Sequence, residues 1–239
     1  MKTPDIPWPH GVLPVFGEEA AAVAEQLASR VAEALAGVLA REERASLAVS
    51  GGSTPVAFFQ ALSRKPLAWA RVDITLADER WVAEDSDASN ARLVREHLLR
   101  EQAAAARFFP LKQPGATARE GQPACERMLA QMKWPLDVLV LGMGNDGHTA
   151  SLFPDAPQLP QALDPGNPDH TIALSPPSQA QERISLTGAA LARARLVFLH
   201  IRGDDKLATL RQALAQPEDV VAMPIRQFLR SGLQVFWSP

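Results

Sequence analysis

The sequence predicts an α/β protein: one Rossmann-like domain over residues 1–239, with a doubly wound, mostly parallel sheet and helices on both of its faces. Short apolar segments typical of strands alternate with helical patterns along most of the chain, which indicates βαβ units. The segment 136–141 is apolar apart from Asp137, as expected of a strand in the middle of a parallel sheet. The chain shows no internal repeat and no shift in composition that would mark a second domain.

The first half of the chain opens with a long amphipathic helix, predicted over residues 18–44 because Val23, Leu27, Val31 and the apolar residues after them recur at helical spacing. A short buried strand is expected at 46–49, followed by a turn rich in serine and glycine. Beyond that turn the pattern predicts a helix at 56–63, a strand at 72–77, helices at 89–100 and 120–132, and the apolar strand at 136–141.

The second half begins with a proline-rich loop, 154–168, which is long enough to be a mobile or functional loop. Two short strands, 171–174 and 183–187, can form a hairpin around Pro176 and Pro177. The last predicted elements are a strand at 195–201, a helix at 204–214 and a strand at 233–237.

Composition excludes several classes of protein. The chain has 239 residues, 46% of them hydrophobic and 21% charged, with a net charge of -3 and a pI of about 6.0. These values are ordinary for a globular protein and leave no electrostatic footprint for nucleic acid. The one cysteine, Cys125, lies in a helical pattern and is expected to be a plain core or surface thiol, which suits a reducing compartment.

Targeting signals are also missing from the sequence. The N-terminal segment 1–9 has no apolar stretch of the kind a signal peptide needs, and no apolar run approaches the roughly 20 residues that span a bilayer. We therefore expect a cytoplasmic protein that engages neither membranes nor nucleic acids, and no obligate protein partner is evident.

The most informative segment is 139–154, where an apolar strand runs directly into Gly142, Gly144 and Gly147. Glycines permit a tight turn with close approach of the backbone. Asp146 and His148 stand within this turn, and histidine is the side chain whose pKa lies nearest neutrality. A glycine-rich turn with titratable groups at the carboxyl end of a strand is how open α/β sheets build active sites. Asp146 and His148 are therefore the candidate acid/base pair; the alternative is a capping aspartate beside a structural histidine.

Two other interpretations of this segment are weaker. Gly142, Gly144 and Gly147 match the dinucleotide fingerprint G-x-G-x-x-G, which also requires an acidic residue about 20 positions later. A proline-rich loop occupies that region here. Asp78, Asp146 and His148 are of metal-ligating types, but no metal-binding motif or cysteine cluster supports such a site. We therefore expect neither a nucleotide cofactor nor a metal.

A second candidate site is the turn that closes the strand 46–49 and opens the next helix. Exposed backbone N–H groups at a helix N-terminus bind anions, and hydroxyl groups add further donors. The turn lacks the Gly-Lys-Ser/Thr ending of a Walker A loop, and Pro55 stands where a G-x-S-x-G nucleophile elbow needs glycine. A plain turn capped by Thr54 or Ser53 is an equally good interpretation. The residues proposed to bind substrate here are Ser50, Gly51, Gly52, Ser53 and Thr54.

Charged residues follow other predicted strands and turns. Asp78 and Arg80 come at the end of the strand 72–77, where a guanidinium can hold a phosphate and a carboxylate can accept from hydroxyls. Arg183 opens a strand, and Lys206 lies at a strand-to-helix turn. Each of these taken alone would be a surface charge, but together with the Ser/Gly turn they can form a phosphate site. The other histidines have no partner motif and are expected to be structural or exposed: His10, His97, His170 and His200.

In this order, the segments resemble the 6-phosphogluconolactonase family, within the wider group that includes glucosamine-6-phosphate deaminase/isomerase. The resemblance extends over roughly residues 15–237, and the long Gly/Asp/His segment is its most specific part. It implies the isomerase/lactonase variant of the fold. The matching segments are Ser50–Pro55, Asp78–Val82, Ser89–Asn90, Gly142–Pro154, Arg183–Thr187 and Gly203–Lys206.

The choice between the two branches rests on the residues after His148. The deaminase branch continues with a Phe-Asn-Glu-Pro-like segment whose glutamate assists the sugar-ring chemistry. This chain has Ser151, Leu152 and Phe153 before Pro154, so isomerisation and deamination would lack one acid/base group. Lactone hydrolysis requires less. The deaminase or isomerase remains the alternative, and a sugar-phosphate sensor without catalysis is a third interpretation.

The resemblance implies hydrolysis of 6-phospho-D-glucono-1,5-lactone to 6-phosphogluconate in the oxidative pentose phosphate pathway. We expect His148 to activate the attacking water, and Asp146 either to hold His148 in place or to help polarise the substrate. Backbone N–H groups of the Gly142–Gly147 turn, Gly144 included, are expected near the oxyanion. The 6-phosphate is expected on Gly51, Gly52, Ser53 and Thr54 with Arg80, Arg183 and Lys206, and sugar hydroxyls near Asp78. Neither cofactor nor metal is needed.

Overall fold

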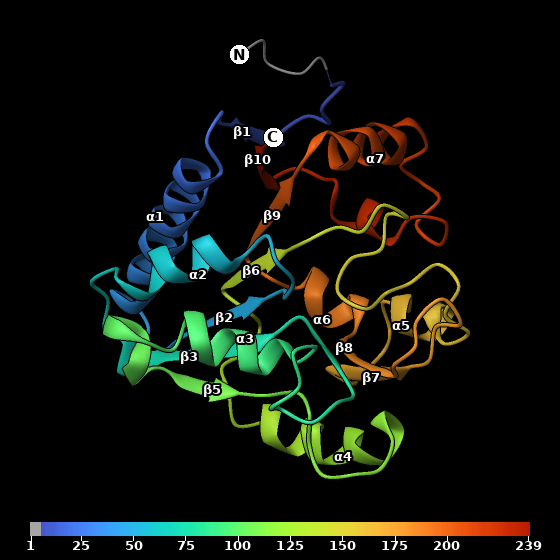
Figure 1. Cartoon of the computed structure of the whole chain (residues 1–239), viewed down its shortest axis with the longest axis horizontal. Helices are drawn as coiled ribbons and strands as arrows, with labels where there is room; N and C mark the ends of the chain where they lie inside the picture. Colours follow the sequence, from blue (N-terminus) through green and yellow to red (C-terminus); the bar gives the residue numbers. More distant parts are fainter. Residues whose placement is uncertain (1–5) are drawn as a thin grey trace.

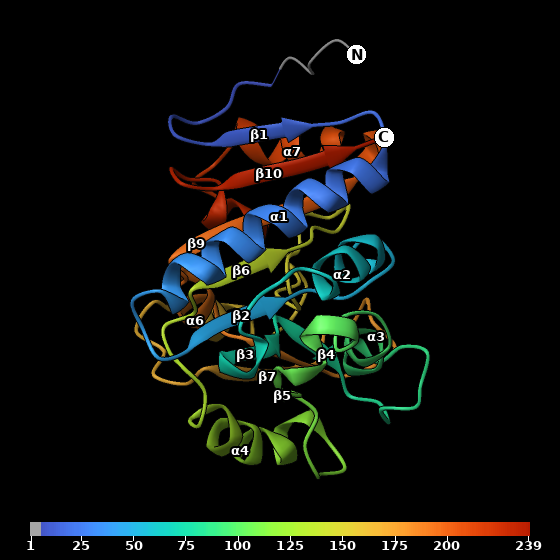
Figure 2. The same cartoon turned by 90° about the vertical axis from the view of Figure 1, so that its left-hand side faces the viewer.

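The computed structural model describes residues 6–239, and its largest element is a seven-stranded sheet in the order β1-β10-β9-β6-β2-β3-β5. Every neighbouring pair in it is parallel. Figures 1 and 2 show α1 and α2 along one side of the sheet and α6 and α7 along the other, so the predicted fold class is confirmed. The strands are β1 (Leu13–Phe16), β2 (Ala45–Val49), β3 (Val72–Leu76), β5 (Arg107–Phe109), β6 (Val138–Leu141), β9 (Leu196–Arg202) and β10 (Gln234–Ser238).

A second sheet of three antiparallel strands lies beside the first, in the order β4-β8-β7: β4 (Asp78–Arg80), β7 (Thr171–Leu174) and β8 (Arg183–Leu186). The hairpin expected between the last two strands is confirmed. The expectation that Asp78 and Arg80 simply end the strand 72–77 is wrong, because the chain changes sheets at Ala77. The amide of Ala77 still bonds Val49 of the main sheet, whereas its carbonyl accepts from Leu186 of the second.

Each predicted helix is present, and three of them (α1, α3 and α4) are shorter than predicted. The first helix ends at Leu39 rather than at 44, because the amides of Arg41 and Glu42 both bond the carbonyl of Val38 in a closing turn. Ser89 and Thr117 begin two others through hydroxyls that accept from the backbone three residues later. The helices are α1 (Ala20–Leu39), α2 (Val56–Ser63), α3 (Asn90–His97), α4 (Ala118–Leu129), α5 (Leu159–Leu163), α6 (Gly188–Ala192) and α7 (Asp204–Ala215).

Several elements have no clear sequence pattern. The strands β1 and β5 are the two edges of the main sheet, and a short edge strand with exposed side chains has no strong apolar pattern. The loop 154–168 contains the short helix α5. Three 3-10 segments complete the described elements: Trp69–Arg71, Glu101–Ala105 and Pro224–Phe228. Part of the expectation about the N-terminal segment concerns residues 1–5, which lie outside the described residues.

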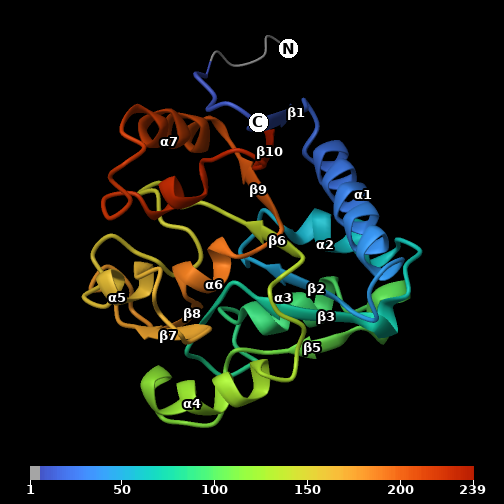
Figure 3. The same ribbon diagram turned by 180° about the vertical axis from the view of Figure 1, so that it is seen from behind.

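The topology positions the site. The neighbouring strands β2, β6 and β9 are parallel, so their carboxyl ends meet at one edge of the sheet. The Ser/Gly turn, the Gly/Asp/His turn and the turn before α7 therefore come together there, as expected at a switch point of an open α/β sheet. Figure 3 shows α4 beyond β5 at one end of the molecule and β1 and β10 at the other, with these turns between. Among residues 6–239, no helix combines the length and the apolar character needed to cross a membrane.

Candidate active site

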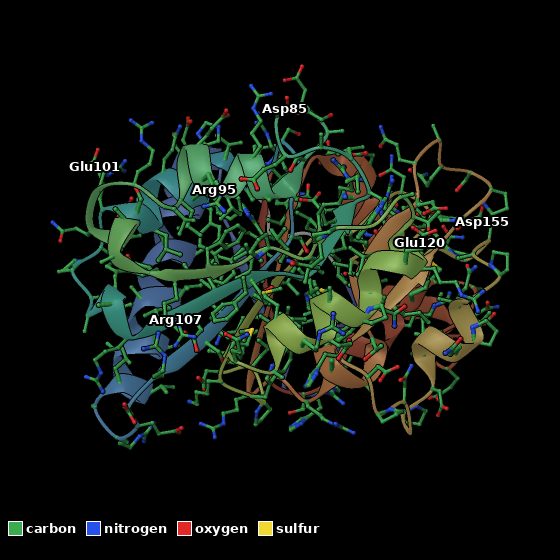
Figure 4. All side chains as sticks on the ribbon, turned by 90° about the horizontal axis from the view of Figure 1, so that it is seen from below. Asp85, Arg95, Glu101, Arg107, Glu120 and Asp155 are labelled. Atoms are coloured by element: carbon green, nitrogen blue, oxygen red, sulfur yellow. The ribbon has the colours of Figure 1, made fainter. Side chains whose placement is uncertain are left out.

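A cavity of about 330 Å³ opens where β2, β6 and β9 end. Its volume lies within the range of small-molecule sites. Charged side chains elsewhere, such as Asp85, Glu101 and Asp155, are exposed at the periphery of the molecule (Figure 4). The sequence-predicted site residues that line the cavity are Ser50, Gly51, Gly52, Ser53, Thr54, Asp78, Arg80, Gly144, His148 and Lys206.

The imidazole of His148 is oriented by Asp146. Nδ1 of His148 lies 2.6 Å from Oδ1 of Asp146, and the same oxygen accepts the backbone N–H of His148 at 3.1 Å. Asp146 does not line the cavity itself. Partial burial acts to raise the pKa of Asp146, but the hydrogen bonds and charge of His148 outweigh it and leave the pKa below the usual aspartate value. A charged Asp146 binds the proton on Nδ1, so Nε2 is left as the basic nitrogen.

Packing restricts the ring of His148 on both sides. Phe153 stacks on it with ring centroids 4.0 Å apart and 28° between the planes. A Cβ on Gly144 would lie 2.1 Å from Nδ1 and Cε1 of the ring, so this position accepts only glycine. Gly147 has φ of +79° and its backbone packs on Met223, which again excludes a side chain. The glycines that stand out in the sequence are thus what allows the turn to close around the histidine.

The amides of this turn are partly used within it. The N–H of Gly144 donates to the carbonyl of His148, and that of Gly147 donates to Gly144. The hydroxyl of Thr149 donates to the carbonyl of Gly142. The amides of Gly144 and Gly147 are therefore not available to an oxyanion, and a donor for it has to come from another group at the cavity.

The Ser/Gly turn presents unused donors. The amides of Gly51, Gly52, Ser53 and Thr54 donate to no other group within residues 6–239. Contrary to the expectation of a cap from Thr54 or Ser53, no side chain caps α2, and Pro55 occupies the cap position. Unpaired amides at the start of a helix form an anion site. Ser50 adds a hydroxyl whose Oγ is shielded from solvent and has no hydrogen-bond partner in the part of the chain that the structure describes.

Asn90, at the start of α3, belongs to a segment that carries the family resemblance, but sequence reasoning did not place it in the site. Its Nδ2 donates to the carbonyl of Asp78 at 2.9 Å, and its side chain occupies the space where Gly51 would carry a Cβ. Glu79 accepts from the backbone amides of Asn90 and Ala91 and so holds the N-terminus of α3 against β4. Burial raises the pKa of Glu79, against the lowering effect of these amides.

The charged side chains at the cavity, Asp78, Arg80 and Lys206, each make a hydrogen bond to another part of the protein. Oδ2 of Asp78 accepts the Ser151 hydroxyl at 2.5 Å. Arg80 donates to the carbonyl of Ala88, and Lys206 donates to the Asn145 side chain. Arg202, which the sequence did not single out, is exposed at the cavity mouth.

Arg183 does not line the cavity. It pairs with Arg80 across the β4–β8 ladder, and its guanidinium carbon lies 5.9 Å from the centroid of Phe153. Burial and then the positive charge of Arg80 lower the pKa of Arg183. Both guanidinium groups donate to uncharged oxygens, Arg80 to the carbonyl of Ala88 and Arg183 to Gln179 and Gln181. The carboxylates of Asp78 and Glu79 act on the pKa of Arg183 in the opposite direction.

Comparisons with known proteins identify the family. Residues 18–237 match the family model described as glucosamine-6-phosphate isomerases/6-phosphogluconolactonase. The chain belongs to this family. It is 48% identical over 240 residues to a Pseudomonas aeruginosa protein named 6-phosphogluconolactonase, with 100% of both chains covered.

Further relatives within the glucosamine-6-phosphate isomerase/6-phosphogluconolactonase family carry the same name. A Rhizobium meliloti protein named 6-phosphogluconolactonase is 46% identical over 225 residues, covering 93% of this chain and 97% of the relative. A crystal structure of a 6-phosphogluconolactonase from Shewanella baltica matches with a TM-score of 0.93 at 44% identity, covering 97% of this chain and 100% of that chain.

His200 is a member of the cavity wall that sequence reasoning did not place there. The expectation of a structural or exposed histidine omits its contact with the site: it lies in β9, is 6% exposed and lines the cavity. Its position three residues before Gly203, near the end of a parallel strand, was the available signal.

Cys125 is buried in α4, and burial raises the pKa of its thiol to about 12. Within residues 6–239 no group of three or more His, Cys, Asp or Glu side chains is arranged to hold a metal ion.

Proposed function

We propose that the protein hydrolyses 6-phospho-D-glucono-1,5-lactone to 6-phospho-D-gluconate, the lactonase step of the oxidative pentose phosphate pathway. The observation that carries this proposal is the His148–Asp146 pair at one cavity with the unpaired amides of the Ser/Gly turn. An acid/base group and an anion site in one cavity suit a phosphorylated substrate. The full-length identity to a protein named 6-phosphogluconolactonase supports the same reaction.

His148 is proposed as the general base. Because Nδ1 is occupied by Asp146, Nε2 accepts a proton from water as the water oxygen attacks C1 of the lactone. The tetrahedral oxyanion then collapses, the bond between C1 and the ring oxygen breaks, and the protonated His148 returns its proton to that oxygen. The products are the open-chain acid and the free base. Each step uses only water and groups of this chain, and we propose no metal or covalent intermediate.

The phosphate is proposed to lie on the Ser/Gly turn. The amides of residues 51–54 point to no protein acceptor within the described residues, and Arg80 and Lys206 supply positive charge at the same cavity. Arg183, the cross-strand partner of Arg80, does not line the cavity, and we propose that it contributes through its charge rather than by contact. Asp78 is proposed to accept from sugar hydroxyls. A substrate held at its phosphate presents C1 to His148 in a fixed orientation, which is a large part of catalysis.

The test is lactone hydrolysis. The lactone is generated in situ from glucose 6-phosphate by its dehydrogenase, and the product is measured with 6-phosphogluconate dehydrogenase against spontaneous hydrolysis. We expect a clear acceleration that His148→Gln lowers by at least about 10²-fold. His10→Gln, at an exposed histidine outside the cavity, is the matched control and should leave the rate unchanged. A folded wild-type protein without acceleration contradicts the proposal, and release of ammonia from glucosamine 6-phosphate would support the deaminase instead.

A further inference from the structure

His200 is held at the cavity with its Nδ1 unpaired. It lies in β9, where Leu199 is in register with Leu141 of β6, so His200 follows at the level of Gly142. The residue is 6% exposed and lines the cavity. Its Nδ1 is fully shielded from solvent and has no hydrogen-bond partner among the described residues. Buried polar groups in native proteins are nearly always paired, so an unpaired nitrogen in a residue that lines a cavity calls for an explanation.

The surroundings of His200 keep it uncharged. Phe58 of α2 meets the ring edge-on, with centroids 6.1 Å apart, and Phe236 is its neighbour in β10. Burial among these groups lowers the pKa of His200 to about 4, so the imidazole is neutral at physiological pH. A neutral imidazole offers one donor and one acceptor. This pattern matches a hydroxyl, which also donates and accepts, better than it matches a phosphate.

Under the proposed function, other groups at the cavity bind the phosphate. Arg80 and Lys206 supply the cations, and the amides of the Ser/Gly turn supply uncharged donors. The Ser50 hydroxyl is a second shielded group without a partner among the described residues; Ser50 directly follows β2, the strand that flanks β6 on its other side. Two uncharged polar groups therefore stand on either side of β6 with nothing in the described protein to bond them.

Building on the proposed function, we propose that His200 is a specificity-determining residue whose neutral imidazole hydrogen-bonds one hydroxyl of the sugar ring. It positions the lactone relative to His148 and takes no part in proton transfer. Loss of that hydroxyl from the substrate, or of the imidazole from the protein, should therefore remove the same interaction.

The experiment is a double-mutant-type cycle in which one change is made in the protein and the other in the substrate. Wild-type protein and His200→Phe are assayed for kcat/KM on 6-phosphogluconolactone and on the 2-deoxy, 3-deoxy and 4-deoxy lactones. We expect His200→Phe to lose about tenfold on the full lactone, as suits one hydrogen bond at a desolvated site. For one deoxy lactone, wild type should lose a similar factor while His200→Phe shows little further loss. His200→Gln, which keeps a donor and an acceptor, should recover part of the activity.

The outcomes separate a binding role from a structural one. Equal losses of His200→Phe on all four lactones would show that the residue only supports the fold, and an unchanged rate would show that it does nothing; either overturns the proposal. Folding is checked by circular dichroism and thermal melting, and His200→Met takes the place of the Phe variant if that does not fold. Failure of wild type to hydrolyse any of the lactones overturns the proposed function itself, and this inference with it.

Discussion

Gly144 and His148 are in contact at a point where only a glycine fits, since a Cβ on Gly144 would lie 2.1 Å from Nδ1 and Cε1 of the ring. The imidazole of His148 could move away from a Cβ at this position only by losing its stacking on Phe153 or its hydrogen bond from Nδ1 to Asp146. The geometry of the proposed base is therefore set from three sides, by an absent side chain, an aromatic ring and a carboxylate.

We expect Gly144→Ala to lower kcat by about 10² or more, because the new methyl displaces the ring from Asp146 and from the substrate. The thermal midpoint should fall by only a few degrees, since the ring can rotate into the cavity. Coupled lactonase kinetics and a thermal melt test this. Gly37→Ala, where nothing lies within 4 Å of the added Cβ, is the matched control. A fully active Gly144→Ala protein would contradict the contact as a determinant of catalysis.

Asp146→Asn tests the orienting role of the carboxylate. Because an amide can donate to Nδ1, the substitution permits the tautomer that carries its proton on Nε2, and that tautomer cannot accept one from water. We expect kcat to fall by at least about 10²-fold with KM little changed, as for loss of an acid/base contribution. Asp155→Asn, at an exposed aspartate outside the cavity, is the control. Equal activity of the two variants would show that Asp146 does not act through His148.

The part of this site that the sequence could predict is the part built from local signals. The apolar strand β6 and the glycines after it are visible as a strand followed by a turn, and parallel strand order then brings the turns after β2, β6 and β9 to one edge. The helix α2 has its predicted bounds, because the Ser/Gly turn and Pro55 mark where it begins.

The rest depends on pairings between distant segments. That Asp78 and Arg80 form β4 follows from hydrogen bonds to β8, more than 100 residues later, and no local pattern contains that information. His200 is one polar residue in an apolar strand; its place near the strand end is a weak signal in the sequence, and its register beside β6 brings it to the cavity. The motif around Arg183 predicts contact with the phosphate, whereas its strand directs the side chain against Phe153, outside the cavity wall.

Arg183→Met tests whether that residue acts through charge. It removes the second guanidinium beside Arg80 and keeps much of the length of the side chain, so we expect KM for the phosphorylated lactone to rise by about 5–30-fold, as for loss of a charge-assisted interaction. Hydrolysis of unphosphorylated gluconolactone should be unaffected. Arg30→Met, at a side chain 63% exposed, is the control. Equal losses on both lactones would indicate that Arg183 supports the second sheet and does not contribute to phosphate binding.

Asp137 stabilises the opposite end of the sheet. It is fully buried at the residue before β6, accepts from the amide of Ser46 at 2.8 Å, and pairs with Lys133 at 2.6 Å and Arg195 at 3.0 Å. Asp137→Asn leaves two cations short of a partner, so we expect the free energy of unfolding to fall by about 3 kcal/mol. Urea denaturation measures this.

Because the network lies away from the cavity, kcat and KM should be unchanged at a temperature where Asp137→Asn is folded. Glu42→Gln, which removes a half-exposed partner of the same two cations, should cost much less stability. A stability loss in Asp137→Asn no greater than in Glu42→Gln would show that burial does not strengthen the network.

His200 makes a specific contribution to the pH dependence of stability. Its pKa is about 4 in the folded protein, because burial disfavours the charged form, against 6.5 for an ordinary histidine. Below pH 6.5 the unfolded chain binds a proton at His200 that the folded protein does not, so stability falls as the pH drops from about 6.5 to about 4. Because a tenfold change in a proton-binding constant corresponds to about 1.4 kcal/mol, the loss over this range approaches about 3 kcal/mol.

In His200→Gln this loss is absent, whereas every other titrating group behaves the same in both proteins. The difference in free energy of unfolding between wild type and variant, measured with urea from pH 7 to pH 4.5, should therefore change steadily in favour of the variant as the pH falls. His10→Gln, at an exposed histidine, should run parallel to wild type. A His200→Gln curve that also stays parallel to wild type would show that His200 binds its proton equally well in the folded and unfolded states, and hence that it is not desolvated at the cavity wall.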